Sequence, residues 1–185
     1  MKNSRKDKKI IRVNEKIILK QIDLSDANDI FRTIDSQREY LGKWLPFVSI
    51  TKEIGDTEKF IQSILDTPEE KREYVFVIHF NSKFVGLIGF KDTDKLNKKT
   101  ELGYWLSESH QKKGIITQSL KVLIDFAFEN LDINRIQIKC AVGNIPSISI
   151  PKRLGFKYEG IERDGELLSK NRFTDLKVYS RLKNE

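Results

Sequence analysis

The stretch HQKKGIITQSL, residues 110–120, joins two lysines and a glycine to the start of an apolar, helix-periodic segment. Lys112 and Lys113 supply ammonium groups, and Gly114 lets a ligand approach the backbone closely. The first N–H groups of a helix have no partner within it, and the helix dipole places a partial positive charge there. We therefore expect an anion to bind at this helix start. An ordinary strand-to-helix turn with two solvated lysines is the alternative.

A second polar pattern, NIPS at residues 144–147, precedes another apolar segment. Asn144 is a preferred N-cap residue, and Pro146 suits the first turn of a helix. Ser147 would lie in the same turn. We therefore expect Asn144 and Ser147 at the start of a short helix, where capping the helix and contacting a ligand are compatible roles.

The single cysteine and the two histidines limit the chemistry further. Cys140 shares the apolar side of the strand-like segment NRIQIKCAV with Ile136, which favours inert packing; a covalent nucleophile is the alternative. His79 and His110, with one cysteine, are too few for a zinc site, so we expect no metal. The sequence also lacks the G-x-x-x-x-G-K-[ST] loop for nucleotide phosphates and the G-x-S-x-G turn.

The hydrophobic pattern predicts the elements that position these residues. It predicts, in order, a strand at 16–22, a helix capped by Ser25, a helix capped by Thr57, and strands in REYVFVIHF, KFVGLIGFKD and TELGYWLS. A helix from Gly114 to Asn130 follows, with Ile116, Leu120, Leu123, Ile124, Ala127 and Leu131 on one face. The strand NRIQIKCAV, a short helix around 146–154, and strands in FKYEGIERDG and FTDLKVYSRL complete the series. This order predicts an α/β (α+β) fold with a mixed, largely antiparallel central sheet of six to seven strands and about four flanking helices.

Length and composition fit one globular domain with a sizeable core. Of the 185 residues, we expect 1–12 to form a basic, flexible tail and 13–185 a single domain. No apolar run is long enough to span a membrane, the basic start lacks the apolar stretch of a signal peptide, and one cysteine suits a reducing cytoplasm. The net charge of +7 could attract an acidic partner, but the basic residues are scattered along the chain and do not form one patch. We therefore expect no direct nucleic-acid binding.

Three segments carry a family resemblance, and they occur in one order: ELGYWLSESHQKKGIITQSL, NRIQIKCAVGNIPSISIPKRLGFKYEG and FTDLKVYSRL. Together they resemble the GCN5-related N-acetyltransferases (GNAT), and most of all the ribosomal-protein N-terminal acetyltransferase subgroup. The resemblance is strong from Glu101 to the C-terminus and looser over the N-terminal half. It implies acetyl-coenzyme A (acetyl-CoA) as cosubstrate, and transfer of its acetyl group to a primary amine by direct attack.

The resemblance also implies a coenzyme site around the helix start. The family's pyrophosphate loop has the form Q/R-x-x-G-x-G/A, and its place here is taken by Gln111, Lys112, Lys113, Gly114, Ile115, Ile116 and, just after it, Thr117. Ile116 stands where the family has its second small residue. Backbone N–H groups of Tyr104, Trp105 and Leu106 would hold the thioester carbonyl and the pantetheine arm, and Asn144 would bind amides of that arm.

Catalytic roles follow from the same resemblance. Glu166 matches a glutamate of the subgroup and is our first candidate for the base; Glu101, at a position where many family members have a carboxylate, is the second. The alternative for Glu166 is a solvated glutamate in a loop, and the alternative for Glu101 is a charge at a strand edge. Ser147 would hydrogen-bond near the thioester sulfur or protonate the leaving thiolate through water. Other branches have a tyrosine acid where this chain has Pro151, and we expect the proline to break the short helix.

The sequence and the family resemblance limit the acetyl acceptor only to the class of primary amines. A protein α-amine, with a pKa of about 7.7–8.0 against about 10.4 for lysine, is partly neutral at cellular pH and suits a carboxylate base. We expect the N-terminal α-amine of a ribosomal or other protein; alternatives are a polyamine, an antibiotic amine, or a non-catalytic acyl-CoA-binding module. Trp44 and Phe47 could line the acceptor groove or simply the core, and Tyr179 is expected to pack. A homodimer is expected by resemblance.

Overall fold

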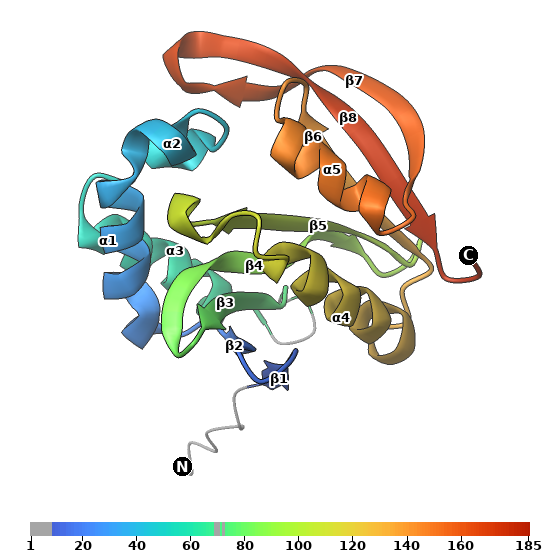
Figure 1. Cartoon of the computed structure of the whole chain (residues 1–185), viewed down its shortest axis with the longest axis horizontal. Coiled ribbons are helices and arrows are strands. Elements are labelled where there is room, and N and C mark those ends of the chain that lie inside the picture. Colours follow the sequence, from blue (N-terminus) through green and yellow to red (C-terminus); the bar gives the residue numbers. More distant parts are fainter. Residues whose placement is uncertain (1–8, 69–70, 72) are drawn as a thin grey trace.

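The structure, a computed structural model, describes residues 9–68, 71 and 73–185. Its centre is an eight-stranded sheet with the strand order β1-β2-β3-β4-β5-β6-β8-β7 (Figure 1). Neighbouring strands are antiparallel except for β5 and β6, which are parallel. The strands are β1 Ile10–Arg12, β2 Ile17–Gln21, β3 Val75–Phe80, β4 Lys83–Asp94, β5 Lys99–Leu106, β6 Arg135–Ala141, β7 Lys157–Leu168 and β8 Arg172–Leu182.

The predicted mixed, largely antiparallel sheet is confirmed, with eight strands in place of six to seven. The additional strand is β1, which falls within the segment expected as a tail. It pairs with β2 through Ile11 and Leu19, so this part of the segment belongs to the sheet. Residues 1–8 of the expected tail lie outside the described residues.

In the part of the chain that the structure describes, five α-helices cover the two faces of the sheet: α1 Ala27–Ser36, α2 Arg38–Gly42, α3 Ile54–Asp66, α4 Ile115–Asn130 and α5 Ile145–Arg153. On one face, α1, α2 and α3 bury a cluster that includes Ile30, Ile61 and Trp105. On the other face, α4 lays Leu120 and Leu123 on the sheet, and α5 covers its far end (Figure 1). The sheet therefore separates two apolar layers, and a site can approach it from either side.

The caps of the first two helices differ from those predicted. A short 3-10 turn, Leu24–Asp26, precedes α1, and its cap is Asp23, whose side chain accepts a hydrogen bond from the backbone N–H of Ser25. α3 is capped by Glu53 in place of Thr57. Thr57 lies within α3 and is only 3% exposed. Both predicted caps are wrong because an acidic side chain earlier in each segment takes the role.

β5 and β6 run together for only a short distance in the described chain. Their register consists of three pairs: Lys99 with Arg135, Thr100 with Ile136, and Glu101 with Gln137. Beyond Glu101 the strands diverge, and β5 continues to Leu106 with β4 as its partner. The edge of β5 that faces β6 therefore has free backbone groups, which is unusual in the interior of a sheet.

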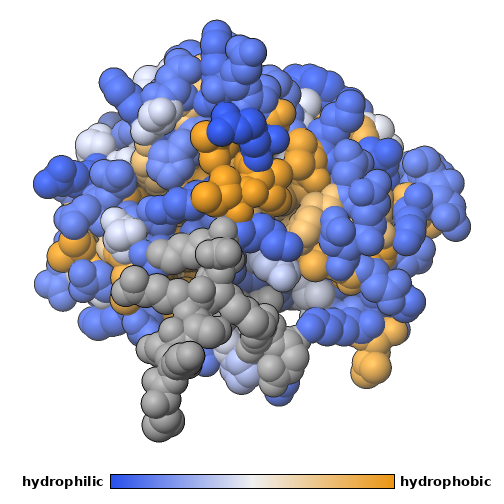
Figure 2. Space-filling model, turned by 90° about the horizontal axis from the view of Figure 1, so that it is seen from below, coloured by the Kyte–Doolittle hydropathy of each residue, from blue (hydrophilic) through white to orange (hydrophobic). Residues whose placement is uncertain are grey.

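The surface is largely hydrophilic, as the high content of charged residues predicts. Viewed from below Figure 1, hydrophobic side chains gather near the upper middle of a face that is mostly polar and charged, and smaller hydrophobic areas lie elsewhere on it (Figure 2). Among the described residues, no helix combines the length and the apolar character that crossing a membrane requires.

Glycine at position 86 is predicted to be required for the pairing of β4 with β5. A Cβ there would overlap the carbonyl oxygen of Trp105, and backbone atoms cannot move aside without loss of pairing. We expect Gly86→Ala to lower the free energy of unfolding by about 1–3 kcal/mol. Gly55→Ala, where a Cβ would meet only the Glu53 side chain at 3.6 Å, should instead raise it by up to about 1 kcal/mol. Urea unfolding measures both, and a neutral Gly86→Ala would contradict the steric argument.

Candidate functional site

A cleft of about 400 Å³ opens where β5 and β6 diverge, between the starts of α4 and α5. Most of the residues predicted for the coenzyme site line it: Tyr104, Trp105, Leu106, Gln111, Lys112, Gly114, Ile115, Ile116, Thr117, Asn144 and Ser147. Lys113 is not among them, and its Nζ lies 5.8 Å from the ring centroid of Phe80. Glu101 and Glu166 also lie outside this cleft. The fold thus brings together segments that are far apart in the sequence.

The start of α4 has the geometry that an anion site needs. Gly114 is the N-cap and adopts a left-handed conformation with φ of +72°. No side chain among the described residues caps this helix, so its first N–H groups remain available to a ligand. Ile116, which replaces the expected small residue, is buried in the core under α4. Its bulk is therefore accommodated by the core.

The sequence analysis did not single out Arg153 or Tyr40, which both line this cleft. Arg153, in the last turn of α5, donates from Nη1 to Thr117 Oγ1 at 2.9 Å and brings a guanidinium to the start of α4. Tyr40 of α2 accepts a hydrogen bond from Gln111 Nε2. Burial raises the pKa of the Tyr40 hydroxyl. Neither residue has a local sequence signal, because each reaches the cleft only when two separate helices pack.

Three polar side chains meet on the α5 side of the cleft. The hydroxyl of Tyr104 lies 3.1 Å from Ser147 Oγ, and Ser147 Oγ donates to Cys140 Sγ at 3.3 Å. Asn144 caps α5, as predicted, because its Oδ1 accepts the backbone N–H of Ser147 at 3.3 Å. Ser147 is thus held from both its backbone and its side chain.

The environment of Cys140 favours the packing role. Burial raises the pKa of this thiol, although hydrogen bonds with Ser147 and Tyr104 act in the opposite direction. The thiol therefore stays protonated at neutral pH and is a poor nucleophile. Tyr179 is likewise buried, and its ring lies 5.4 Å from that of Tyr158.

The prediction that Pro151 breaks the short helix is wrong. α5 continues through Pro151 to Arg153. A proline has no N–H, so the carbonyl oxygen of Ser147, one turn earlier, has no helical donor. The hydroxyl of Tyr104 donates to this oxygen at 3.3 Å instead. The missing backbone bond is thus replaced by a bond from β5, which ties α5 to the diverging strand.

Glu101 lies on the opposite face of the sheet within a network of charges. Its side chain is 4% exposed, and its two carboxylate oxygens lie 2.8 Å from Lys91 Nζ and 3.8 Å from Lys139 Nζ. Gln137 Nε2 donates to it at 3.0 Å. Burial alone would lower the pKa of Lys91, but the hydrogen bond and charge of Glu101 raise it overall. Both oxygens of Glu101 are therefore engaged by neighbouring side chains, which leaves them poorly placed to reach an acceptor amine.

Glu166 lies on β7, opposite Thr174 of β8, and is half-buried. The strand register from β5 through β6 and β8 to β7 places it on the same face of the sheet as Glu101. Within the described part of the chain it forms no ion pair. Of the two candidate carboxylates, Glu166 is thus the less engaged.

The aromatic connection after α2 contributes to two different cavities. Trp44 lines the first cleft and lies 3.4 Å from the position of a Cβ at Gly143. Phe47, in the 3-10 turn Pro46–Ser49, lines a second cavity on the face covered by α1 and α3. The two residues therefore do not form one wall. No group of three or more His, Cys, Asp or Glu is arranged to hold a metal ion among the described residues.

Comparison with known proteins identifies the architecture. A family model described as an acetyltransferase (GNAT) domain matches residues 16–157. YdaF of Bacillus subtilis (strain 168), named only provisionally as a ribosomal N-acetyltransferase, is 34% identical over 180 residues, which cover 94% of this chain and 95% of that protein. The ribosomal-protein-serine acetyltransferase of Escherichia coli (strain K12) is 30% identical over 172 residues, covering 93% and 96%. A solved structure of RimL, a ribosomal L7/L12 α-N-protein acetyltransferase in complex with coenzyme A, is 27% identical with a TM-score of 0.89, covering 94% and 98%.

The bond between Tyr104 and the Ser147 carbonyl is open to a double-mutant test. Tyr104→Phe should lower the free energy of unfolding by about 1–3 kcal/mol, because it leaves that carbonyl without a donor. Pro151→Ala restores a backbone N–H that can donate to the Ser147 carbonyl oxygen. In that background Tyr104→Phe should therefore lower the free energy of unfolding by about 1 kcal/mol less. Chemical unfolding of the four proteins measures the coupling. Additive costs would show that the two residues do not share this carbonyl.

Proposed function

The chain belongs to the GNAT acetyltransferase family, and on that premise we propose that it acetylates the N-terminal α-amine of a protein, a ribosomal protein in particular. The family establishes the enzyme class, an N-acetyltransferase. The observation that supports the site is the cleft at the divergence of β5 and β6, where an uncapped helix start lies beside a free strand edge. Relatives that act on ribosomal-protein N-termini support the choice of acceptor.

The residues of the first cleft fit acetyl-CoA as cosubstrate, the ligand class of the RimL complex. The open N–H groups at Gly114 and Ile115, with Lys112 and Arg153 nearby, would hold the pyrophosphate. Free backbone groups of β5 from Tyr104 to Leu106 would bind the pantetheine arm and stabilise the oxyanion formed from the thioester carbonyl. Asn144 already caps α5, so any contact with the arm uses its remaining hydrogen-bonding groups.

Glu166 is the base in this proposal. It takes a proton from the acceptor ammonium, directly or through water, and the neutral nitrogen attacks the thioester carbon. Glu101 is fixed between Lys91 and Lys139, so we assign it a positioning role toward Lys91. The carbon–sulfur bond then breaks, the attacking nitrogen releases its second proton to water, and the departing thiolate takes up a proton through water. Ser147 Oγ, which contacts the Tyr104 hydroxyl, turns from Cys140 to donate a hydrogen bond to that thiolate, while Asn144 holds the Ser147 backbone N–H.

A small-molecule amine is the second candidate acceptor, and a non-catalytic acyl-CoA-binding module the third. The net charge of +7 favours an acidic acceptor protein over a polycationic amine such as a polyamine. The half-buried Glu166, free of ion pairs in the described chain, favours an enzyme over a module that only binds.

Intact-mass analysis tests the reaction and the acceptor class together. The protein is incubated with acetyl-CoA and a dissociated mixture of ribosomal proteins, and we expect the mass gain of one acetyl group on one protein, mapped to its first residue. Ser147→Ala is expected to slow this transfer while acetyl-CoA binding persists. Transfer to small amines alone would overturn the protein acceptor, and binding without any transfer would overturn the enzymatic role.

The role of Glu166 predicts a particular pH dependence. Glu166→Gln should lower kcat by about 10²–10⁴ at pH 6–7, where most of the acceptor amine is protonated and needs a base. The deficit should shrink toward pH 9, because most of an amine with a pKa of about 8 is then already neutral. Asp164→Asn, an exposed residue in the same hairpin, serves as the control and should retain wild-type rates. An undiminished rate for Glu166→Gln across this range would exclude Glu166 as the base.

A further inference from the structure

A second cavity, of about 530 Å³, lies on the face of the sheet that α1 and α3 cover. It extends to Gly103, Tyr104 and Trp105 of β5, and the last two also line the first cleft. The two cavities thus reach the same segment of β5 from opposite faces of the sheet. This segment lies beyond the last pair with β6, so no neighbouring strand separates the cavities there.

The lining of this cavity is mainly apolar. Its apolar side chains come from α1, the 3-10 turn, α3 and the sheet, and include Ile34, Phe47, Ile50, Phe60, Leu87 and Trp105. Ile50 and Phe60 are 72% and 45% exposed, so apolar side chains also surround the opening. A cavity of this character favours an apolar group of a ligand over water.

Two glycines form the floor of the cavity. Gly89 of β4 and Gly103 of β5 are paired across the strands, and both line it. A Cβ at Gly103 would meet nothing closer than the Lys91 side chain, at 3.8 Å, so the space above this glycine is open. A larger residue at 103 would therefore fill the cavity without a clash with the backbone.

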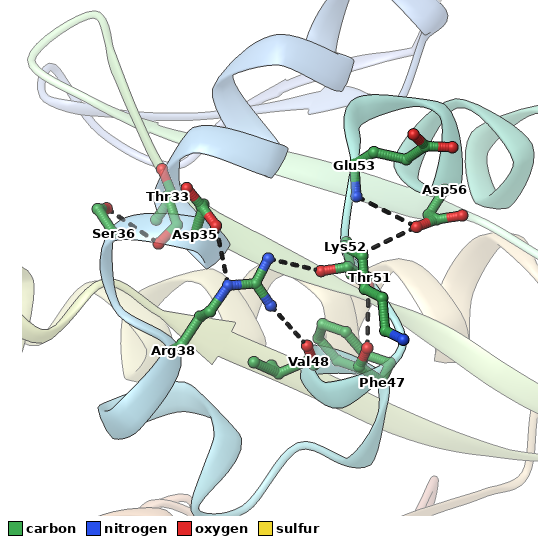
Figure 3. Close-up of polar contacts among 10 residues, drawn as sticks. All are labelled: Thr33, Asp35, Ser36, Arg38, Phe47, Val48, Thr51, Lys52, Glu53 and Asp56. Atoms are coloured by element: carbon green, nitrogen blue, oxygen red, sulfur yellow. Dashed lines mark hydrogen bonds and ion pairs between the residues drawn. The ribbon is translucent and has the colours of Figure 1, made fainter.

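One wall of the cavity is fixed by Arg38 (Figure 3). Its guanidinium donates to the carbonyl oxygens of Val48 at 2.9 Å and Thr51 at 2.7 Å, and to Asp35 at 2.8 Å. These bonds hold the turn that carries Phe47 and Ile50. The wall is therefore formed before a ligand binds, which lowers the entropic cost of binding.

The polar groups of the cavity restrict what can bind. Thr57 is 3% exposed, lines the cavity, and its Oγ1 has no hydrogen-bond partner among the described residues. The ammonium of Lys91 lies at the end nearest Glu101 and keeps its charge. Asp56 and Lys59 also line the cavity, but their charges pair with each other at 3.6 Å. An apolar ligand with one polar atom therefore suits Thr57, whereas a cationic side chain meets the ammonium of Lys91 and no unpaired carboxylate among the described lining residues.

We propose that this cavity is the acceptor pocket and that it selects amines with a bulky, uncharged apolar side chain within the first two residues of the acceptor. The inference rests on the proposed transfer to an α-amine and adds the chemical class of the acceptor. The side chain lies between α1 and α3 over Gly103, and the amine points toward the free edge of β5. A residue with a cationic side chain at these positions is rejected.

A peptide panel tests the pocket. Four peptides share one sequence after their first two residues, which are Ala-Gly, Ala-Leu, Leu-Gly or Ala-Lys, and kcat/KM is measured with saturating acetyl-CoA. At least one leucine peptide should exceed Ala-Gly by tenfold or more, and Ala-Lys should fall below Ala-Gly. In Gly103→Val the leucine preference should disappear, while the KM for acetyl-CoA stays unchanged. Equal rates for the peptides, or a preference that survives Gly103→Val, would overturn the pocket.

Loss of acetyl-CoA binding would show that Gly103→Val does not fold. In that case a second variant tests whether the cavity is the acceptor pocket. Phe60→Ala, at the opening, should weaken the leucine preference severalfold, whereas Ile10→Ala, 63% exposed on β1, should leave it unchanged. An unchanged preference in Phe60→Ala would also overturn the pocket. Transfer to none of the peptides is a failure of the proposed function, whereas transfer without preference is a failure of the pocket alone.

Discussion

The architecture depends on the point at which β5 and β6 stop pairing. Glu101 and Gln137 form the last pair, and the side chain of Gln137 donates to the carboxylate of Glu101. The same carboxylate binds Lys91 of β4 and Lys139 of β6, so three adjacent strands are tied together at the divergence. The backbone groups of β5 that are proposed to hold the coenzyme lie beyond this point, because only there does β5 have a free edge.

The two faces of the sheet are coupled through β5 itself. Successive residues of a strand point to opposite faces, so Tyr104 faces α5 while Gly103 and Trp105 face α1 and α3. Tyr104 binds α5 through the carbonyl that Pro151 leaves free, which fixes the width of the first cleft. Gly103, one residue away, leaves the space of the second cavity. A single strand can thus present one ligand on each face and bring their reacting atoms to a common edge.

Local signals made part of this predictable. The periodicity of α4, the glycine before it and the capping pattern of Asn144 all depend on residues close in sequence, and all three were found as predicted. Arg153, Lys91 and the partners of Glu101 depend on helix packing and strand register, which one sequence does not specify. Pro151 was misread for the same reason, since its compensating donor comes from β5. β1 was missed because three residues in a basic segment carry little periodicity.

The charge network at the divergence has a structural purpose other than stability. Removing two charges from water costs free energy that their attraction only partly restores, so a buried ion pair is a weak source of stability. An apolar residue at 101 could pack against the same strands, yet it would leave the ammonium of Lys91 without a fixed position. Glu101 instead holds that ammonium at the end of the second cavity, with Lys91 Nζ 2.8 Å from a Glu101 carboxylate oxygen. The charge of Glu166 also contributes to the raised pKa of Lys91. The network therefore fixes the position of the Lys91 ammonium at the wall of the second cavity.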